Sequence, residues 1–174
     1  MGLSSGPIAL QADNGFYLSR IDRGGGFDFI EANKPIVDIY TKYSATQLSS
    51  NKISLRASNG LYLSRISLAG SDYIVATKSD IDVYSTFILE YIDDNVIALC
   101  ADNGKYLSRS NAGGIFNYIK PDKHDLDIYP SSFKLPLCWL HSFTPVTSLS
   151  MLPGIHSLAV AMHLEIHRVY TRNH

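Results

Sequence analysis

Apolar and polar residues alternate over three short stretches that recur along the chain at a nearly constant interval. The stretches are IALQA at 8–12, ISLRA at 53–57 and IALCA at 97–101. Alternation with a period of two residues is typical of a β-strand with one face in a core. Each stretch leads into an Asn-Gly pair and then a Tyr-Leu-Ser-Arg segment. This arrangement favours a β-hairpin whose two turn residues both adopt a positive φ.

The hairpins belong to a longer unit that occurs three times. The turn glycines are spaced 45 and then 44 residues apart, at Gly15, Gly60 and Gly104. A second block follows in each copy, written FIEANKPIVDIY, YIVATKSDIDVY and YIKPDKHDLDIY, and it ends at Tyr40, Tyr84 and Tyr129. Agreement over two separated blocks indicates a true repeat. We expect the copies to span 6–50, 51–94 and 95–137.

Each copy offers four short strands, which favours an all-β architecture built from three similar units. A β-propeller blade has a comparable length, but propellers typically have about four or more blades. One unit cannot bury its own apolar face, whereas three units around a common axis share one core. The sequence therefore predicts a β-trefoil over 6–137. We expect its inward residues to include Leu18, Leu63 and Leu107.

Residues 138–174 lie outside the repeat and form a C-terminal tail with five of the six histidines. The apolar spacing within 155–170 predicts an amphipathic helix. A disordered tail, or one from an alternative reading of the gene, would explain the same change in composition. His163 and His167 are four residues apart, but HLEIH lacks the glutamate position of a zinc-protease motif and a third ligand. We expect no metal site.

Composition and charge narrow the classes of partner. The chain is 45% apolar and 18% charged, with a net charge of −1, so it has no excess of cations for phosphates. Its apolar runs are shorter than the roughly 18 residues of a membrane span, and no secretory signal is visible. We therefore expect a cytoplasmic protein that neither binds nucleic acid nor inserts into membranes. Cys100 falls on an apolar strand, where we expect a structural thiol.

Candidate catalytic groups are few, and we expect no enzyme and no cofactor. An aspartate follows a lysine by four residues in each copy, at Asp38, Asp82 and Asp127. Threefold repetition would place these carboxylates far apart, so structural ion pairs are the better interpretation. The serines of the repeated strand are Ser19, Ser64 and Ser108. They have no histidine partner in the repeat pattern and no nucleophile elbow.

The repeated turns carry the candidate binding residues. Short polar side chains precede each turn glycine, and a tyrosine follows two residues after it. The set is Asp13, Asn14, Tyr17, Ser58, Asn59, Tyr62, Asp102, Asn103 and Tyr106. Hydrogen-bonding groups beside an aromatic ring are typical of a shallow sugar site. The alternative interpretation is that Asn-Gly only forms the turn and that the tyrosine packs against the barrel.

The strings ADNGFYLSR, ASNGLYLSR and ADNGKYLSR, with blocks such as VATKSDIDVYSTF, resemble the agglutinin domain of amaranthin-type plant lectins. They are also similar to the wider fascin-like trefoils. The resemblance covers 6–137 and implies binding of galactose or N-acetylgalactosamine glycans at sites between subunits of a homo-oligomer. The family's site residues lie outside the repeated motif and are not carried over. Ricin-type trefoils are disfavoured because the repeats lack Gln-x-Trp.

The sequence thus predicts a lectin that binds glycans or glycoproteins. The principal alternative is a fascin-like module that binds actin or another protein without binding sugar. A third alternative is a structural or plant-defence role without a glycan ligand.

Overall fold

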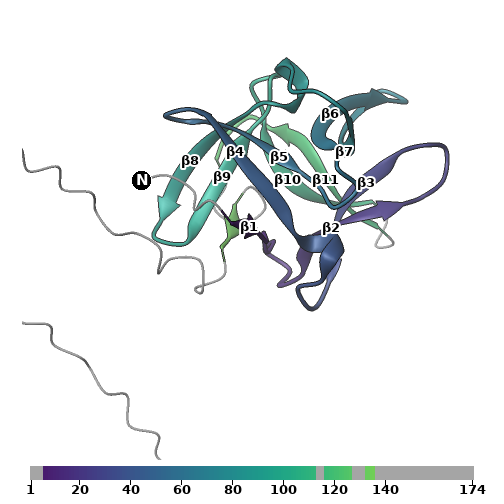
Figure 1. Ribbon diagram of the computed structural model, residues 1–174, viewed down its shortest axis with the longest axis horizontal. Helices are drawn as coiled ribbons and strands as arrows, with labels where there is room; N and C mark the ends of the chain where they lie inside the picture. Colours follow the sequence, from purple (N-terminus) through teal and green to yellow (C-terminus); the bar gives the residue numbers. More distant parts are fainter. Residues whose placement is uncertain (1–5, 113–115, 127–131, 136–174) are drawn as a thin grey trace, which may run out of the picture. The chain divides into compact units, whose positions relative to one another are not determined.

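The computed structural model describes residues 6–112, 116–126 and 132–135 of the chain. Over these ranges the protein consists of β-strands and two short 3-10 helices (Figure 1). The strands are β1 Pro7–Ile8, β2 Tyr17–Asp22, β3 Asp28–Lys34, β4 Tyr43–Ser49, β5 Lys52–Arg56, β6 Tyr62–Leu68, β7 Ser71–Lys78, β8 Phe87–Asp93, β9 Val96–Cys100, β10 Tyr106–Ala112, β11 Phe116–Lys123 and β12 Phe133–Lys134. The 3-10 helices are η1 Ile39–Thr41 and η2 Val83–Ser85. The prediction of an all-β protein is confirmed for this part of the chain.

A ring of antiparallel strands forms the barrel. The pairing runs from β1 to β4, β5, β8, β9 and β12. The first and last copies close the ring: Gln11 N donates to Lys134 O at 2.9 Å, and Lys134 N donates to Gln11 O at 2.8 Å. Closure leaves the barrel without a free sheet edge at this junction. The repeat needs all three copies for this, because the third copy supplies β9 and β12.

Three hairpins accompany the barrel, one from each copy: β2–β3, β6–β7 and β10–β11. Their second strands meet one another, since β3 pairs with β7 at Phe29–Val75 and with β11 at Glu31–Tyr118. The rings of Phe29, Tyr73 and Tyr118, one from each copy, have centroids 5.3–5.5 Å apart. Two of these contacts are edge-to-face and the one between Phe29 and Tyr118 is tilted, and aromatic contacts of this kind stabilise the junction of the hairpins.

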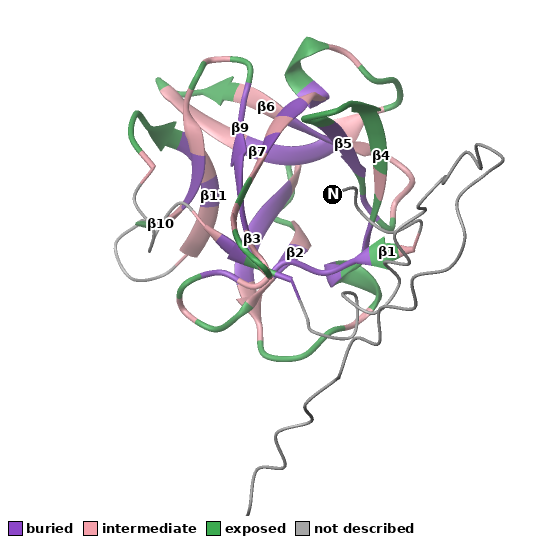
Figure 2. Cartoon of the chain, turned by 90° about the vertical axis from the view of Figure 1, so that its left-hand side faces the viewer, coloured by how far each residue is buried: buried purple, intermediate pink, exposed green. Residues whose placement is uncertain are grey.

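The core is built from equivalent positions of the three copies. Figure 2 shows the buried residues along the strands, and the exposed ones in the loops and on parts of strands such as β4 and β6. Tyr43 of β4, Phe87 of β8 and Phe133 of β12 are fully buried at 0% exposure. The predicted inward leucines are confirmed, with exposures of 1%, 2% and 2% for Leu18, Leu63 and Leu107. One core shared by three units explains why a single copy would not fold alone.

The hairpin turns differ from the expected two-residue turn. Only the glycine has a positive φ, which is +79° at Gly15, +80° at Gly60 and +75° at Gly104. Each glycine N–H donates to the carbonyl of the alanine three residues earlier, at 2.9–3.0 Å. The prediction of a positive φ at the preceding asparagine is therefore wrong. A three-residue loop, in which a type I turn is followed by a left-handed glycine, requires glycine only at its last position.

Several predictions concern residues outside the described ranges. They are the tail at 138–174 with its predicted helix at 155–170, the histidine pair His163 and His167, and Asp127 and Tyr129 of the third copy. In the part of the chain that the structure describes, no helix has the length and apolarity required to cross a membrane.

Candidate binding site at the seams between copies

Three of the predicted turn residues, Asp13, Ser58 and Asp102, lie at the seams between neighbouring copies. We call the junctions of the first and second, second and third, and third and first copies the first, second and third seam. At each seam an arginine of one copy donates to the turn residue of the next. The bonds run from Arg20 Nε to Ser58 Oγ at 3.4 Å, from Arg65 Nε and Nη2 to the Asp102 carboxylate at 2.7 and 2.6 Å, and from Arg109 Nε and Nη2 to the Asp13 carboxylate at 2.7 Å each.

The asparagines fasten each turn to the second strand of the hairpin. In every copy the Nδ2 group donates to a carbonyl, on Ala32, Ala76 or Pro121, at 3.0–3.1 Å. The Oδ1 atom accepts the backbone N–H two residues later, at 3.0–3.1 Å. Asn14, Asn59 and Asn103 thus have a structural function. Their part in ligand binding stays a prediction.

The tyrosines that follow the turns are half-buried and have different partners. The Tyr106 hydroxyl donates a hydrogen bond to the Glu90 carboxylate at 2.9 Å, and this bond raises the pKa of Tyr106. The guanidinium of Arg56 lies 5.6 Å from the centre of the Tyr62 ring. No contact of this kind involves Tyr17 among the described residues. The nine predicted residues are therefore distributed over the three turns, and the structure does not gather them into one site.

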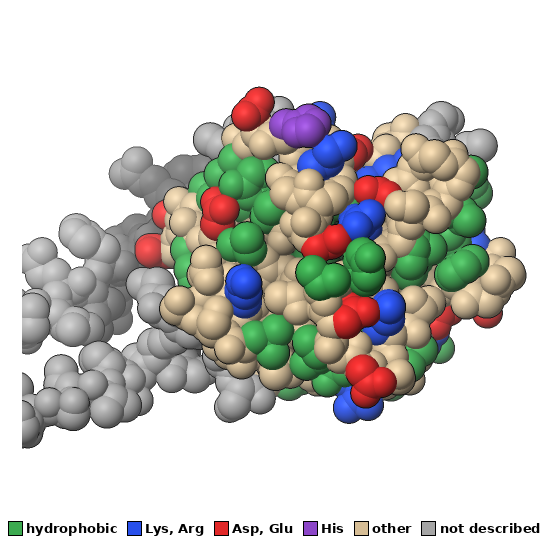
Figure 3. Space-filling model, turned by 90° about the horizontal axis from the view of Figure 1, so that it is seen from above, with side chains coloured by type: hydrophobic (Ala, Val, Ile, Leu, Met, Phe, Trp, Pro, Cys, Tyr) green, Lys and Arg blue, Asp and Glu red, His purple; other side chains and the backbone are tan. Residues whose placement is uncertain are grey.

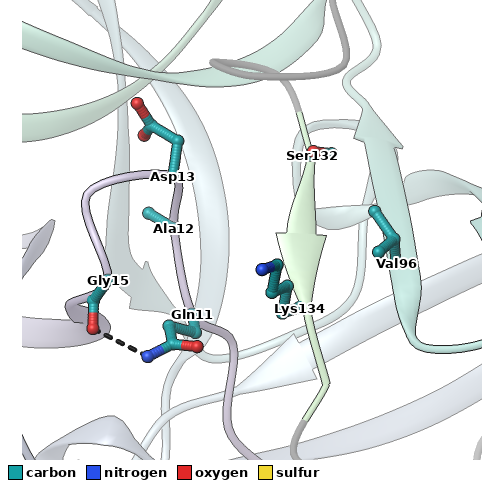
Figure 4. Close-up of a pocket in the computed structure, with 7 residues that line it drawn as sticks. All are labelled: Gln11, Ala12, Asp13, Gly15, Val96, Ser132 and Lys134. Atoms are coloured by element: carbon teal, nitrogen blue, oxygen red, sulfur yellow. Dashed lines mark hydrogen bonds between the residues drawn. The ribbon is translucent and has the colours of Figure 1, made fainter.

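One predicted residue, Asp13, lines a pocket at the third seam (Figure 4). The pocket has a volume of about 310 Å³ and is lined by Gln11, Ala12, Asp13, Gly15, Val96, Ser132 and Lys134. Gln11 Nε2 donates to Gly15 O at 2.7 Å, which leaves the Gln11 side-chain oxygen as an acceptor. The pocket is of the size of a small polar molecule.

A second feature, which is duplicated, surrounds two exposed tyrosines. Tyr40 in η1 is 44% exposed, and Tyr84 in η2 is 43% exposed. The guanidinium carbon of Arg20 lies 5.4 Å from the centre of the Tyr40 ring, and the Lys34 ammonium lies 5.6 Å from it. The second copy repeats this with Arg65 at 5.4 Å and Lys78 at 5.5 Å from Tyr84. These cations hold each ring by cation–π attraction while a large part of the ring faces solvent.

Each tyrosine lies in a 3-10 helix whose N-cap residue is an aspartate. The Asp38 and Asp82 carboxylates accept backbone N–H groups of the helix, and the backbone N–H of each aspartate donates in return to the hydroxyl oxygen of Thr41 or Ser85. The same aspartates form ion pairs with lysines, Lys34–Asp38 at 3.1 Å and Lys78–Asp82 at 2.7 Å. Structural ion pairs, predicted from the four-residue spacing, are confirmed for these two copies. The capping bonds fix where each tyrosine projects.

Aliphatic side chains lie beside both tyrosines. Ile39 is 65% exposed and Val83 is 62% exposed. Figure 3 shows one face of the molecule, where basic and acidic side chains lie side by side and apolar ones lie between them. Each cluster thus joins an exposed aromatic ring and charged hydrogen-bonding groups, and an exposed aliphatic residue precedes the tyrosine in the chain. We call Tyr40, Arg20, Lys34 and Asp38 the first cluster, and Tyr84, Arg65, Lys78 and Asp82 the second cluster.

The electrostatics of the seams and of the second cluster follow from their ion pairs. The hydrogen bonds from Arg109 lower the pKa of Asp13, and those from Lys78 lower the pKa of Asp82. The bonds to Asp102 raise the pKa of Arg65, so this guanidinium stays charged. Asp13, Asp82 and Arg65 are therefore ionised at neutral pH and act as fixed donors and acceptors. They are not poised to exchange protons near pH 7.

The serines that were considered as nucleophiles are buried. Ser19, Ser64 and Ser108 are 0%, 0% and 1% exposed. Ser19 donates to Asn33 Oδ1 at 2.6 Å, and Ser108 donates to the Asp122 carboxylate. These hydroxyls tie the two strands of each hairpin together, and a substrate cannot reach them.

The fold has clear relatives among solved structures, although no protein-family model matches the chain and no curated protein matches its sequence. ThreeFoil, a designed threefold-symmetric protein, is similar with a TM-score of 0.64 and 14% identity over 74% of this chain and 96% of that one. This likeness shows that the chain has a β-trefoil-like fold. A Polyporus squamosus lectin bound to an influenza-binding epitope is similar with a TM-score of 0.62 and 10% identity over 78% of this chain and 50% of that one. The SDF2-like protein of Arabidopsis thaliana has a TM-score of 0.60 and 12% identity over 78% and 94%.

The residues that the sequence analysis missed are Arg20, Arg65, Tyr40 and Tyr84. The tyrosines were visible as the last residues of the second repeated block. Their exposure depends on how η1 and η2 pack, which the pattern of the block does not contain. The arginines end the repeated Tyr-Leu-Ser-Arg segment, and their partners lie 37 or 38 residues further along the chain.

Proposed function

We propose that the protein binds carbohydrates and that the first and second clusters are its binding sites. The duplicated arrangement of Tyr40 and Tyr84 carries this proposal. A pyranose presents an apolar face that packs on an aromatic ring and hydroxyls that bond to charged groups around it. Both clusters offer a ring, cations and a carboxylate in the same order, at equivalent positions of two copies.

The fold supports the proposal, because a similar structure is that of a lectin with a bound epitope. That likeness concerns the fold alone, and the site argument comes from this chain's own residues. Galactose and N-acetylgalactosamine glycans are the first ligands to test, because the resemblance to amaranthin-type agglutinins implies them. Binding rather than catalysis is part of the proposal, since the charged groups of the clusters are already paired within the protein.

A glycan array probed with the full chain tests the proposal. We expect binding to a defined set of glycans, and a decrease of about tenfold in affinity for the site whose tyrosine is replaced in Tyr40→Ala or Tyr84→Ala. Tyr91→Ala is the matched control, because Tyr91 is 38% exposed and lies outside both clusters. Binding to no glycan would overturn the proposal.

The fascin-like alternative is favoured by one observation, the exposure of Ile39 and Val83 beside the tyrosines. Aliphatic and aromatic side chains together are common at protein interfaces. Co-sedimentation with filamentous actin separates the two functions. If the protein pellets with actin and binds no glycan, it is a protein-interaction module.

A further inference from the structure

Two of the three seam arginines, Arg65 and Arg109, bind the next copy in the same way, at the second and third seams. In each case the Nε and Nη2 atoms form a fork that holds both oxygens of an aspartate. Arg65 holds Asp102 at 2.7 and 2.6 Å, and Arg109 holds Asp13 at 2.7 Å twice. This planar, two-bond geometry is the one that a guanidinium prefers for a carboxylate.

The first seam has the same arginine without the carboxylate. Ser58 stands where the other turns have aspartate, and Arg20 Nε donates to its hydroxyl at a long 3.4 Å. Among the described residues, no group accepts a hydrogen bond from Arg20 Nη2. The remaining nitrogen, Arg20 Nη1, donates to the Asp28 carboxylate at 2.7 Å, just as Arg65 Nη1 donates to the Asp72 carboxylate at the second seam. The fork of Arg20 thus lacks the carboxylate that its two equivalents hold.

The charge balance at the first seam is compatible with a further carboxylate on Arg20. Arg65 lies between two carboxylates, Asp72 and Asp102, whereas Asp28 is the one carboxylate that pairs with Arg20 in the described part of the chain. Asp28 also accepts Asn59 Nδ2 at 2.8 Å, as Asp72 accepts Asn103 Nδ2 at 3.0 Å. The second seam therefore shows that this arrangement accommodates a second carboxylate next to the first. An anion on Arg20 would give the first seam the same charge as the second.

We propose that the first seam binds a sugar that carries a carboxylate, such as a uronic or sialic acid. The carboxylate occupies the Nε and Nη2 edge of Arg20 in place of the missing aspartate. The sugar ring lies against Tyr40, whose ring centre is 5.4 Å from the same guanidinium. The exposed tyrosine favours a sugar over an acidic peptide. This inference rests on the proposed function, because it assigns a ligand class to the first cluster.

Isothermal titration calorimetry of the full chain tests the inference, with D-glucuronic acid and D-glucose as paired probes and acetate as a third. We expect glucuronate to bind at least tenfold more tightly than glucose, with acetate weaker than glucuronate. Ser58→Asp should reduce glucuronate binding at least tenfold, because the new side chain would hold Arg20 as Asp102 holds Arg65. Asp-Asn-Gly already forms the turn in the other two copies, so this variant is expected to fold.

Ser58→Ala is the matched control, since it leaves the fork open and should keep the preference for glucuronate. The inference would be overturned if glucuronate and glucose bound equally, or if Ser58→Asp left glucuronate binding unchanged. Sugar binding at Tyr84 would still support the proposed function in that case. Acetate or an acidic peptide that binds as tightly as glucuronate would overturn the assignment to a sugar. Binding of neither sugar by a protein that also fails on the glycan array overturns both proposals.

Discussion

Arg109 and Asp13 join the last copy of the repeat to the first through two hydrogen bonds of 2.7 Å, although they lie 96 residues apart in the chain. Their side chains are 20% and 19% exposed. The pair lies at the same junction as the backbone bonds between Gln11 and Lys134. This side-chain ion pair thus reinforces the closure of the barrel, at a junction that forms only when the third copy meets the first.

Replacing either partner of this ion pair should destabilise the protein. We expect Asp13→Ala and Arg109→Ala each to lower the free energy of unfolding by about 1.5–3 kcal/mol, the range for hydrogen bonds to charged groups. The double variant should cost less than the two single costs added, because the groups interact directly. Urea unfolding of the three variants gives the coupling energy. The exposed Asp94, which forms no ion pair among the described residues, supplies the control Asp94→Ala, expected within about 0.5 kcal/mol of wild type.

The same pair predicts a sensitivity to acid. Arg109 lowers the pKa of Asp13 in the folded protein, so the unfolded chain takes up the proton first as the pH falls. The stabilising contribution is complete above about pH 4, the ordinary value for aspartate, and is lost as the pH falls through the lowered pKa. We expect the difference in stability between wild type and Asp13→Asn to be largest near neutral pH and to shrink below about pH 4. A difference that stays constant over this range would contradict the assignment.

Tyr43 predicts a stabilising substitution. Its hydroxyl is buried and has no hydrogen-bond partner among the described residues, and burial strongly raises its pKa. Phe87 and Phe133 occupy the equivalent core positions of the other copies without a hydroxyl. We expect Tyr43→Phe to raise the free energy of unfolding by about 1 kcal/mol, because an unsatisfied buried polar group is removed. Chemical denaturation measures this, and Phe87→Tyr, expected to be destabilising, is the reciprocal variant.

Much of the fold was predictable from local pattern. The strand alternation, the hairpins and the inward Leu18, Leu63 and Leu107 depend on neighbouring residues, and period-two patterns report them directly. The ion pair of Lys34 with Asp38 was predictable for the same reason, because the two residues are four positions apart. The turn was predicted as a hairpin but with the wrong backbone, since Asn-Gly fits both a two-residue loop and the three-residue loop that forms.

The candidate site was less accessible to sequence reasoning. The seam contacts, such as Arg65 with Asp102, join residues of different copies, and the repeat pattern does not say which copies touch through which side chains. Tyr40 stands in a conspicuous repeated block, yet its exposure follows from the capping of η1 and from the cations on its ring. The meaning of Ser58 appears only when its seam is compared with the other two.

The two clusters predict at least two binding sites in one chain. Because the first and second clusters lie in different copies and share no residue, each tyrosine should control one site without affecting the other. In titrations with a glycan found on the array to bind both clusters, we expect Tyr40→Ala and Tyr84→Ala each to remove one site from the stoichiometry. Beads coated with this glycan should be cross-linked by the wild-type protein, and each variant should cross-link them less. A single variant that abolishes all binding would contradict independent sites, and Tyr91→Ala should leave both the stoichiometry and the cross-linking unchanged.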